Sequence, residues 1–320
     1  MIKWSYVKLI ILEVFMKKLV VLFILMTFAV KGMADELSLH TECFSPVVYA
    51  IPGQNGLGSD KSYVEEIMGD NCEIIPVSTP TNLPDLGQSF CERHLDDALK
   101  IGNKEGVIYA TSQGTATALN YVASSNRANQ IKALVLEAAM ASGNSAIYHT
   151  VTGPLMDMKI VKNIPGSYYV LPYLANLVCP GYRPAGKQAI KSIDNIPNDL
   201  PIIIIHSEGD KQLPFEGACA LYNRLRKNGN ENVYLVRKEG AQHIRILNSD
   251  NDKSMVKRIL KKHLLRSGED CDNLSEFQPD PSRFGKEYQD LIAKERRHTH
   301  FERVLGLAGL VLFLKQMCGF

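Results

Sequence analysis

The sequence predicts an α/β fold, with a mostly parallel sheet of about six strands and helices on both faces. Short apolar runs of strand length alternate with longer segments whose apolar residues recur at helical spacing. One run, PIIIIH at 201–206, is almost purely aliphatic, as in strands that are buried on both faces. Polar loops rich in Gly, Asp and Ser follow several of the runs, at the sheet edge where parallel sheets bind ligands.

The individual elements follow this alternation along the whole chain. Strands are expected at 45–51, 73–77, 107–110, 132–137, 201–206 and 232–237. Helices are expected at 59–68, 90–101, 115–122, 214–227 and 254–265. Because each strand is followed by a helix, the strands are expected to run parallel, with crossover helices packed on the sheet.

One stretch, 143–198, breaks the alternation by separating two strands with far more residues than an ordinary crossover. It carries several Tyr, Leu and Met residues together with prolines and glycines. We expect a cap that covers the active site and supplies apolar substrate contacts, since insertions on a fixed scaffold often carry function. The alternative is a helical decoration that packs on the sheet.

The segment 106–121, GVIYATSQGTATALNY, joins the end of a strand to the start of a helix, with Ser112 on the turn between them. A serine at this place is typical of a nucleophile elbow, a strained turn that needs small residues two positions before and after the serine. Ala110 and Gly114 fill these positions; glycine is usual at both, so Ala110 departs from the pattern. The alternative is an ordinary strand, loop and helix with a capping Ser or Thr.

An acid and a histidine follow the serine in the chain. Asp210 lies in the turn after the aliphatic strand, and His243 lies in the loop after the last strand. The order of serine, acid and histidine, each at the C-terminal end of its own strand, resembles the α/β-hydrolase family. The resemblance covers about 45–265 and implies a serine hydrolase.

The resemblance also implies a role for each residue. Ser112 would be the nucleophile, His243 would take its proton, and Asp210 would orient the imidazole. The family's oxyanion hole uses the backbone N–H after the nucleophile, here Gln113, and one from the loop after the family's third strand, here Gln54. The resemblance implies no cofactor, and we expect no metal.

Other residues compete for two of these roles. Glu137 ends the preceding strand and Glu208 shares the turn of Asp210, so both are alternative acids. His206 lies at a strand end and is expected to be structural. Three further histidines lie on charged helices and are expected to be solvated: His263, His298 and His300.

Residues 1–34 have the pattern of a secretory signal peptide. Two lysines precede a twelve-residue apolar run at 19–30, and small residues up to Ala34 fit a signal-peptidase site. We expect cleavage after Ala34 and export to the periplasm or the medium. The alternative is an uncleaved N-terminal membrane anchor, for which the apolar run is short. With the leader removed, too little chain precedes the strand at 45–51 for the family's first two strands, so the fold is expected to be a trimmed version.

Charge and cysteine content limit the partners of the protein. The chain has 36 Lys and Arg and 34 Asp and Glu; the leader holds five lysines and one glutamate, which leaves 31 against 33, or −2. Without a basic tract, nucleic-acid binding has no support, and we expect a small-molecule or lipid-like acyl substrate. All seven cysteines follow the leader; Cys43 and Cys72 precede strands that are neighbours in the resembled fold and are expected to form a disulfide.

The expected domains are the signal peptide, a hydrolase domain at 35–265 with its insertion at 143–198, and a linker and helical arm at 266–320. The arm contains an apolar run of eleven residues at 304–314. As a helix this run would be ~16 Å long, about half of a bilayer core. It is expected to dock on the domain or on a partner chain, with contact at a membrane surface as the alternative.

Taken together, these patterns predict an exported serine hydrolase that cleaves an ester, thioester or related acyl bond through an acyl-enzyme. The alternative is a catalytically silent protein of the same fold that serves in binding or attachment, which Ala110 and the C-terminal arm leave open. A peptidase is a third reading, without a sequence signal of its own.

Overall fold

The computed structural model describes residues 46–53, 61–69, 71–78, 85–153, 163–175, 181–264 and 274–300, together with 156, 158 and 161. The predictions of a signal peptide at 1–34, of an oxyanion-hole N–H at Gln54 and of a docked or membrane-facing run at 304–314 lie outside the described residues. So does Cys43, and its pairing with Cys72 therefore stays a prediction.

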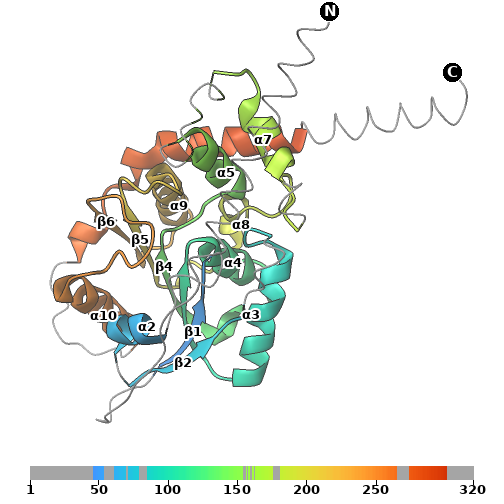
Figure 1. Ribbon diagram of the computed structural model, residues 1–320. Coiled ribbons are helices and arrows are strands. Elements are labelled where there is room, and N and C mark those ends of the chain that lie inside the picture. Colours follow the sequence, from blue (N-terminus) through green and yellow to red (C-terminus); the bar gives the residue numbers. More distant parts are fainter. Residues whose placement is uncertain are drawn as a thin grey trace, which may run out of the picture. The chain divides into compact units, whose positions relative to one another are not determined.

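The core of the domain is a six-stranded, all-parallel sheet with the strand order β2-β1-β3-β4-β5-β6 (Figure 1). Its strands are β1 Val47–Ile51, β2 Glu73–Pro76, β3 Gly106–Thr111, β4 Ile131–Glu137, β5 Ile202–Ser207 and β6 Val233–Lys238. Every residue of β1, β3 and β5 is buried, as their apolar runs predict for strands covered on both faces. The predicted sheet of about six parallel strands is confirmed.

Helices flank the sheet in two groups. The crossover helices are α2 Lys61–Met68, α3 Ser89–Gly102, α4 Gln113–Val122, α9 Phe215–Lys227 and α10 Asp250–Leu264. α2 packs beside α10, whereas α3 packs beside α4 (Figure 1). This is the alternation of strands and helices that the sequence predicts.

The helix α10 begins four residues earlier than the predicted start at residue 254. Its first turn carries Asp250 and Asp252, whose charges suit the positive end of a helix dipole. The hydroxyl of Ser249 accepts the backbone N–H of Asp252 at 3.2 Å, as an N-cap residue does. The prediction followed the apolar spacing, which begins only after this polar first turn, and so placed the start too late.

The insertion between β4 and β5 is helical. It contains α5 Gly143–Thr152, α7 Ser167–Ala175, α8 Ala189–Ser192 and the short 3₁₀ helix η3 Ile193–Asn195. The hydroxyl of Ser142 caps α5 by accepting the backbone N–H of Ser145. The backbone N–H of Gly143 donates to the side-chain oxygen of Gln188 at 2.8 Å, which ties the start of α5 to the segment before α8.

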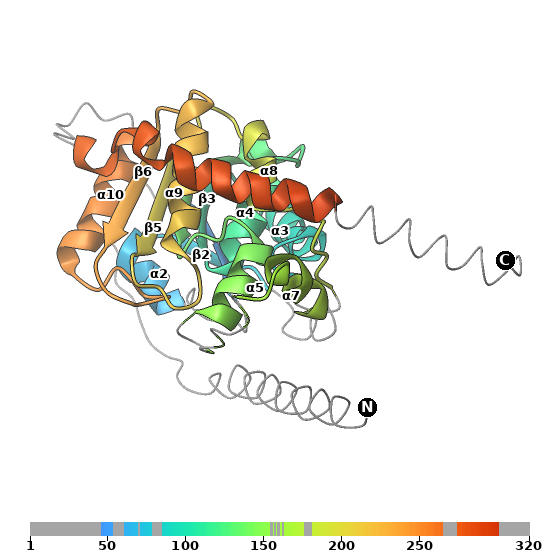
Figure 2. The same ribbon diagram turned by 90° about the horizontal axis from the view of Figure 1, so that it is seen from above.

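The described part of the C-terminal arm packs on the hydrolase domain. It holds two short 3₁₀ helices, η4 Ser275–Phe277 and η5 Pro281–Phe284, and then a helix at 285–300, called here the C-terminal helix. The hydroxyl of Tyr222 on α9 donates to the backbone oxygen of Pro279 at 2.7 Å, and Asn223 donates to that of Pro281. From α9 the C-terminal helix, red in Figure 2, runs past α5 to α7.

A buried carboxylate fixes this helix to the insertion. Glu295 is fully buried and accepts hydrogen bonds from the hydroxyl of Ser142 at 2.5 Å and from the amide of Asn144 at 2.8 Å. The hydroxyl of Tyr168 donates to it at 3.3 Å, and the Lys191 ammonium lies 3.8 Å away. Burial raises the pKa of Glu295, and these donors and the nearby cation oppose that rise. The C-terminal helix therefore holds the beginning of α5 in place.

The prediction that His298 is solvated is wrong. His298 is fully buried, its Nε2 atom lies 3.1 Å from the backbone oxygen of Tyr168, and burial lowers its pKa to about 4. His263 is also partly covered, with its Nε2 atom 2.8 Å from the hydroxyl of Tyr234, whereas His300 is exposed as predicted. Most charged residues of the C-terminal helix lie on its outer face, whereas Glu295 and His298 belong to an inner face of buried residues spaced three and four apart.

Candidate active site

Ser112 lies on a strained turn between β3 and α4. Its backbone has φ 52° and ψ −120°, an uncommon combination for a residue with a side chain. The turn is held on both sides: the Ser112 N–H donates to the backbone oxygen of Glu137 at 2.8 Å, and the hydroxyl of Thr115 donates to the Ser112 carbonyl at 2.6 Å. This strand, strained serine and helix make up the geometry of a nucleophile elbow.

The residues two positions after and before the serine, Gly114 and Ala110, are small for different reasons. A Cβ atom on Gly114 would lie 2.7 Å from the backbone oxygens of both Ile51 and Pro52, so only glycine fits without a backbone shift. Ala110 is fully buried in the middle of the sheet, and its methyl group is part of the hydrophobic core. The departure from glycine at position 110 therefore leaves the elbow intact.

The structure brings the three predicted residues into one hydrogen-bonded chain. His243 Nε2 lies 2.8 Å from Ser112 Oγ, and His243 Nδ1 lies 2.8 Å from Asp210 Oδ2. The other oxygen, Asp210 Oδ1, accepts the backbone N–H groups of Gln212 at 2.7 Å and Leu213 at 3.0 Å. Burial alone would raise the pKa of Asp210, but His243 and these two N–H groups together hold it below its ordinary value. Asp210 is thus an ionised, fixed partner for the imidazole.

The two alternative acids have other partners. Glu208 forms an ion pair with Arg237 at the end of β6. The carboxylate of Glu137 accepts hydrogen bonds from Tyr63, Tyr109 and the backbone of Ile246 and makes none with His243. Of the three candidate carboxylates, only that of Asp210 is bonded to the imidazole in the structure.

Two other histidines lie beside the acid. His206, at the end of β5, is buried with its Nε2 atom 3.5 Å from Asp210 Oδ2. Burial lowers its pKa to about 4, so it is neutral near pH 7 and adds no charge. His149, on α5, has its Nε2 atom 3.3 Å from the backbone oxygen of Asp210. The sequence pattern gives no sign of this contact, because it joins residues 61 positions apart.

One of the two predicted oxyanion donors can be placed. Gln113 is the first residue of α4 and follows Ser112 directly, so its backbone N–H lies in the first helical turn, where N–H groups have no acceptor within the helix. The positive end of the helix dipole lies at the same place. The second donor, Gln54, stays a prediction; the chain is described up to Gly53, which is buried.

No group of three or more His, Cys, Asp or Glu residues in the described part of the chain is arranged to hold a metal ion. Among the helices that the structure describes, none is both long and apolar enough to cross a membrane.

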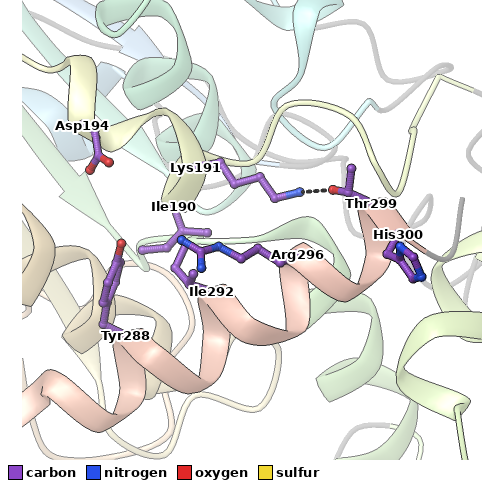
Figure 3. Close-up of a pocket in the computed structure, with 8 residues that line it drawn as sticks. All are labelled: Ile190, Lys191, Asp194, Tyr288, Ile292, Arg296, Thr299 and His300. Atoms are coloured by element: carbon purple, nitrogen blue, oxygen red, sulfur yellow. Dashed lines mark hydrogen bonds between the residues drawn. The ribbon is translucent and has the colours of Figure 1, made fainter. Parts of the chain in front are cut away.

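A separate cavity of about 390 Å³ lies between α8, η3 and the C-terminal helix (Figure 3). It is lined by Ile190, Lys191, Asp194, Tyr288, Ile292, Arg296, Thr299 and His300. The Lys191 ammonium lies 3.2 Å from the hydroxyl of Thr299, and both oxygens of Asp194 accept hydrogen bonds from Arg224. The cavity contains none of the predicted site residues, and several of its polar groups are already bonded to one another or to Arg224.

The parallel sheet, the strained serine turn and the hydrogen-bonded Ser112, His243 and Asp210 define an α/β-hydrolase domain of the serine-hydrolase class. Comparison with known proteins agrees. Residues 149–264 match the model of the prolyl oligopeptidase family. The matched range, less than half of the chain, contains Asp210 and His243 but begins after Ser112. A search of curated protein sequences finds no match.

Solved structures of low sequence identity are similar to this chain. An esterase of Pyrococcus furiosus, Pf2001, is 15% identical over 69% of this chain and 83% of its own, with a TM-score of 0.50. An acylaminoacyl peptidase of Pyrococcus horikoshii is 14% identical over 73% of this chain and 39% of its own, with a TM-score of 0.48. A monoacylglycerol lipase of Paleococcus ferrophilus is 13% identical over 68% of this chain and 96% of its own, with a TM-score of 0.43. The esterase likeness confirms the predicted α/β-hydrolase fold.

Proposed function

We propose that the protein hydrolyses an ester, thioester or related acyl bond through an acyl-enzyme on Ser112. The observation that carries this proposal is the unbroken chain of hydrogen bonds from Ser112 Oγ through His243 to Asp210, at 2.8 Å for each contact. A serine hydroxyl is a weak nucleophile until a base takes its proton, and this arrangement supplies the base and its orienting partner.

In the acylation step, Ser112 Oγ attacks the acyl carbon while His243 Nε2 takes the hydroxyl proton. Asp210 accepts the Nδ1–H of the imidazole and stabilises the imidazolium that forms. The carbonyl oxygen becomes negatively charged beside the N-terminus of α4, where the N–H of Gln113 donates to it. When this intermediate collapses, the imidazolium gives its proton to the leaving group, and the acyl group stays on Ser112.

In the deacylation step, water takes the place of the leaving group. His243 Nε2 removes a proton from the water as its oxygen attacks the acyl carbon. Collapse of the second intermediate returns the proton to Ser112 Oγ and releases the carboxylic acid. The same residues thus serve both half-reactions, and no cofactor takes part in this proposed cycle.

We infer a small or lipid-like acyl substrate and a cap formed by the insertion at 143–198. The contact of His149 with the backbone of Asp210 supports the cap, because it brings α5 against the loop that carries the acid. Ile164, Val170 and Leu174, in and just before α7, are large apolar side chains exposed to solvent, which suits contact with an apolar substrate. The name of the Pyrococcus furiosus esterase supports an ester bond.

A peptidase is the second candidate, because residues 149–264 match the prolyl oligopeptidase family. The same three residues would then attack a peptide carbonyl, with an amine as the leaving group.

Export of the mature chain from Asp35 onward remains a proposal that rests on the leader pattern of the sequence.

Purified full-length protein is expected to react covalently with a fluorophosphonate probe, because the probe captures a serine that a histidine activates. Turnover of a short p-nitrophenyl ester, an acyl thioester and an N-acyl peptide by the same preparation then separates the esterase from the peptidase reading. If the wild-type chain shows neither labelling nor turnover, the better-supported function is that of a catalytically silent binding protein of the same fold.

Ester hydrolysis is expected to rise with pH between roughly pH 5 and 8, because a histidine acts as a base only in its neutral form. Asp210, whose pKa is held below its ordinary value, stays ionised throughout this range. His206, with a pKa of about 4, does not change its charge there. The measurement is kcat/KM between pH 5 and 8, and a flat profile over that range would count against a histidine base.

A further inference from the structure

Glu137 is a fully buried carboxylate at the C-terminal end of β4. Its backbone oxygen accepts the N–H of Ser112, whereas its side chain bonds to the loop that follows His243. The catalytic cycle proposed above does not use this carboxylate. A buried charged group without a role in the chemistry calls for a physical reason, since its desolvation is costly.

The side chain of Glu137 has three donors. Its Oε1 atom accepts the hydroxyl of Tyr63 at 2.8 Å and the backbone N–H of Ile246 at 2.5 Å, and its Oε2 atom accepts the hydroxyl of Tyr109 at 2.5 Å. The Tyr63 oxygen in turn accepts the backbone N–H of Leu247 at 3.3 Å. Two successive N–H groups of the histidine loop are thus bonded to Glu137 and Tyr63.

The loop needs such an anchor because it has no regular structure. Residues 239–249 belong to no helix or strand, so their N–H groups have no sheet ladder or helix to bond to. Arg245 has φ 54°, a left-handed conformation that is uncommon for this residue type. The N–H that follows this turn is the one that donates to Glu137, and the side chains of Ile246 and Leu247 are fully buried beneath the loop.

We propose that Glu137 is a positioning residue for the hydrolase reaction: through Ile246 and Tyr63 it holds the loop so that His243 Nε2 faces Ser112 Oγ. This inference rests on the proposed function. The carboxylate also adds negative charge near the imidazole, which favours the imidazolium formed during acyl transfer.

Several other charged or titratable groups of the described residues lie near His243. Asp210 is bonded to its Nδ1 atom, and His206 on β5 is neutral at the pH of an assay. Arg245, in the same loop, lies with its guanidinium over the ring of Tyr63 at 5.6 Å. Burial raises the pKa of Glu137, whereas its donors and the charge of His243 oppose that rise.

The test is Glu137→Gln in the full chain, which keeps the side-chain volume and removes the charge. We expect kcat to fall about ten-fold or more, with KM within about two-fold, because the imidazole is misplaced in the transition state while substrate binding is unchanged. We also expect the rising limb of the pH profile to move to lower pH by about half a unit, since a lost negative charge disfavours the protonated imidazole. The matched control is Glu295→Gln, also a fully buried glutamate but bonded to Ser142 and Asn144, which is expected to keep the wild-type midpoint.

Hydrogen exchange supplies a readout that does not depend on turnover. The amides of Ile246 and Leu247 are expected to lose protection in Glu137→Gln and to keep it in Glu295→Gln. The proposal would be overturned if Glu137→Gln kept the wild-type kcat, the wild-type midpoint of the pH profile and the wild-type protection of these two amides. A wild-type chain that is not labelled by the fluorophosphonate probe would instead overturn the proposed function, while the exchange result still decides whether Glu137 anchors the loop.

A second variant covers the case in which Glu137→Gln does not fold. Tyr63→Phe keeps the carboxylate and its bond to Ile246 but removes the hydroxyl between Glu137 and Leu247. We expect a lower kcat, an unchanged KM, an unchanged pH midpoint and loss of protection at the Leu247 amide. Full wild-type kcat together with full protection at Leu247 in this variant would contradict the proposal.

Discussion

Replacement of Ser112 by alanine is expected to lower kcat for a short acyl ester by about 10,000-fold or more and to abolish fluorophosphonate labelling. The reason is that the hydroxyl bonded to His243 Nε2 is that of Ser112, so the variant has a base without a nucleophile. The fold is expected to be unaffected, because the Ser112 backbone N–H and carbonyl still bond to Glu137 and Thr115.

Ser124→Ala is the matched control for this variant. Ser124 follows the C-terminal end of the same helix, α4, where its hydroxyl donates to the backbone oxygen of Asn120 at 2.8 Å. This exposed serine is remote from the elbow along the helix, so its replacement is expected to leave labelling and kcat unchanged. If Ser112→Ala kept full activity, the nucleophile would be assigned to the wrong residue.

The candidate site could be predicted because the fold places its residues by a simple rule. In a parallel sheet the carboxyl ends of all strands meet at one edge. Ser112, Asp210 and His243 each follow a strand that the apolar runs already indicate, so their chain order alone predicts that they lie close together. The structure shows the three side chains in contact. It also decides between the two acids of the turn, because Asp210 is hydrogen-bonded to His243 whereas Glu208 pairs with Arg237.

The contacts that sequence reasoning missed join segments that are distant in the chain. Tyr63 and Glu137 meet Ile246 only because α2, β4 and the histidine loop converge in three dimensions. Likewise, Glu295 and His298 lie on a helix whose charges predict a solvated surface, yet both side chains are fully buried against the insertion. Periodicity finds an element, but it does not tell which other element covers the polar residues on its inner face.

Replacement of Asp210 by asparagine is expected to lower kcat by about 10,000-fold while the protein stays folded. The oxygen of asparagine can still accept the N–H groups of Gln212 and Leu213, so the turn keeps its shape. The new amide group would then face His243 Nδ1 as a donor. This favours the tautomer with the proton on Nε2, which cannot take the proton of Ser112.

Glu208→Gln is the control for this change, because Glu208 shares the turn with Asp210 but pairs with Arg237, and it is expected to keep wild-type kcat. The comparison measures kcat, KM and the rate of probe labelling in both variants, with circular dichroism to confirm the fold. Activity of Asp210→Asn within about ten-fold of the wild type would mean that another carboxylate supports the imidazole. Glu137, at the end of β4, is the alternative carboxylate, and the double variant Asp210→Asn with Glu137→Gln tests it. If adding Glu137→Gln to Asp210→Asn lowers kcat far more than Glu137→Gln does alone, the acid role belongs to Glu137. A large loss of kcat from Asp210→Asn by itself assigns the role to Asp210.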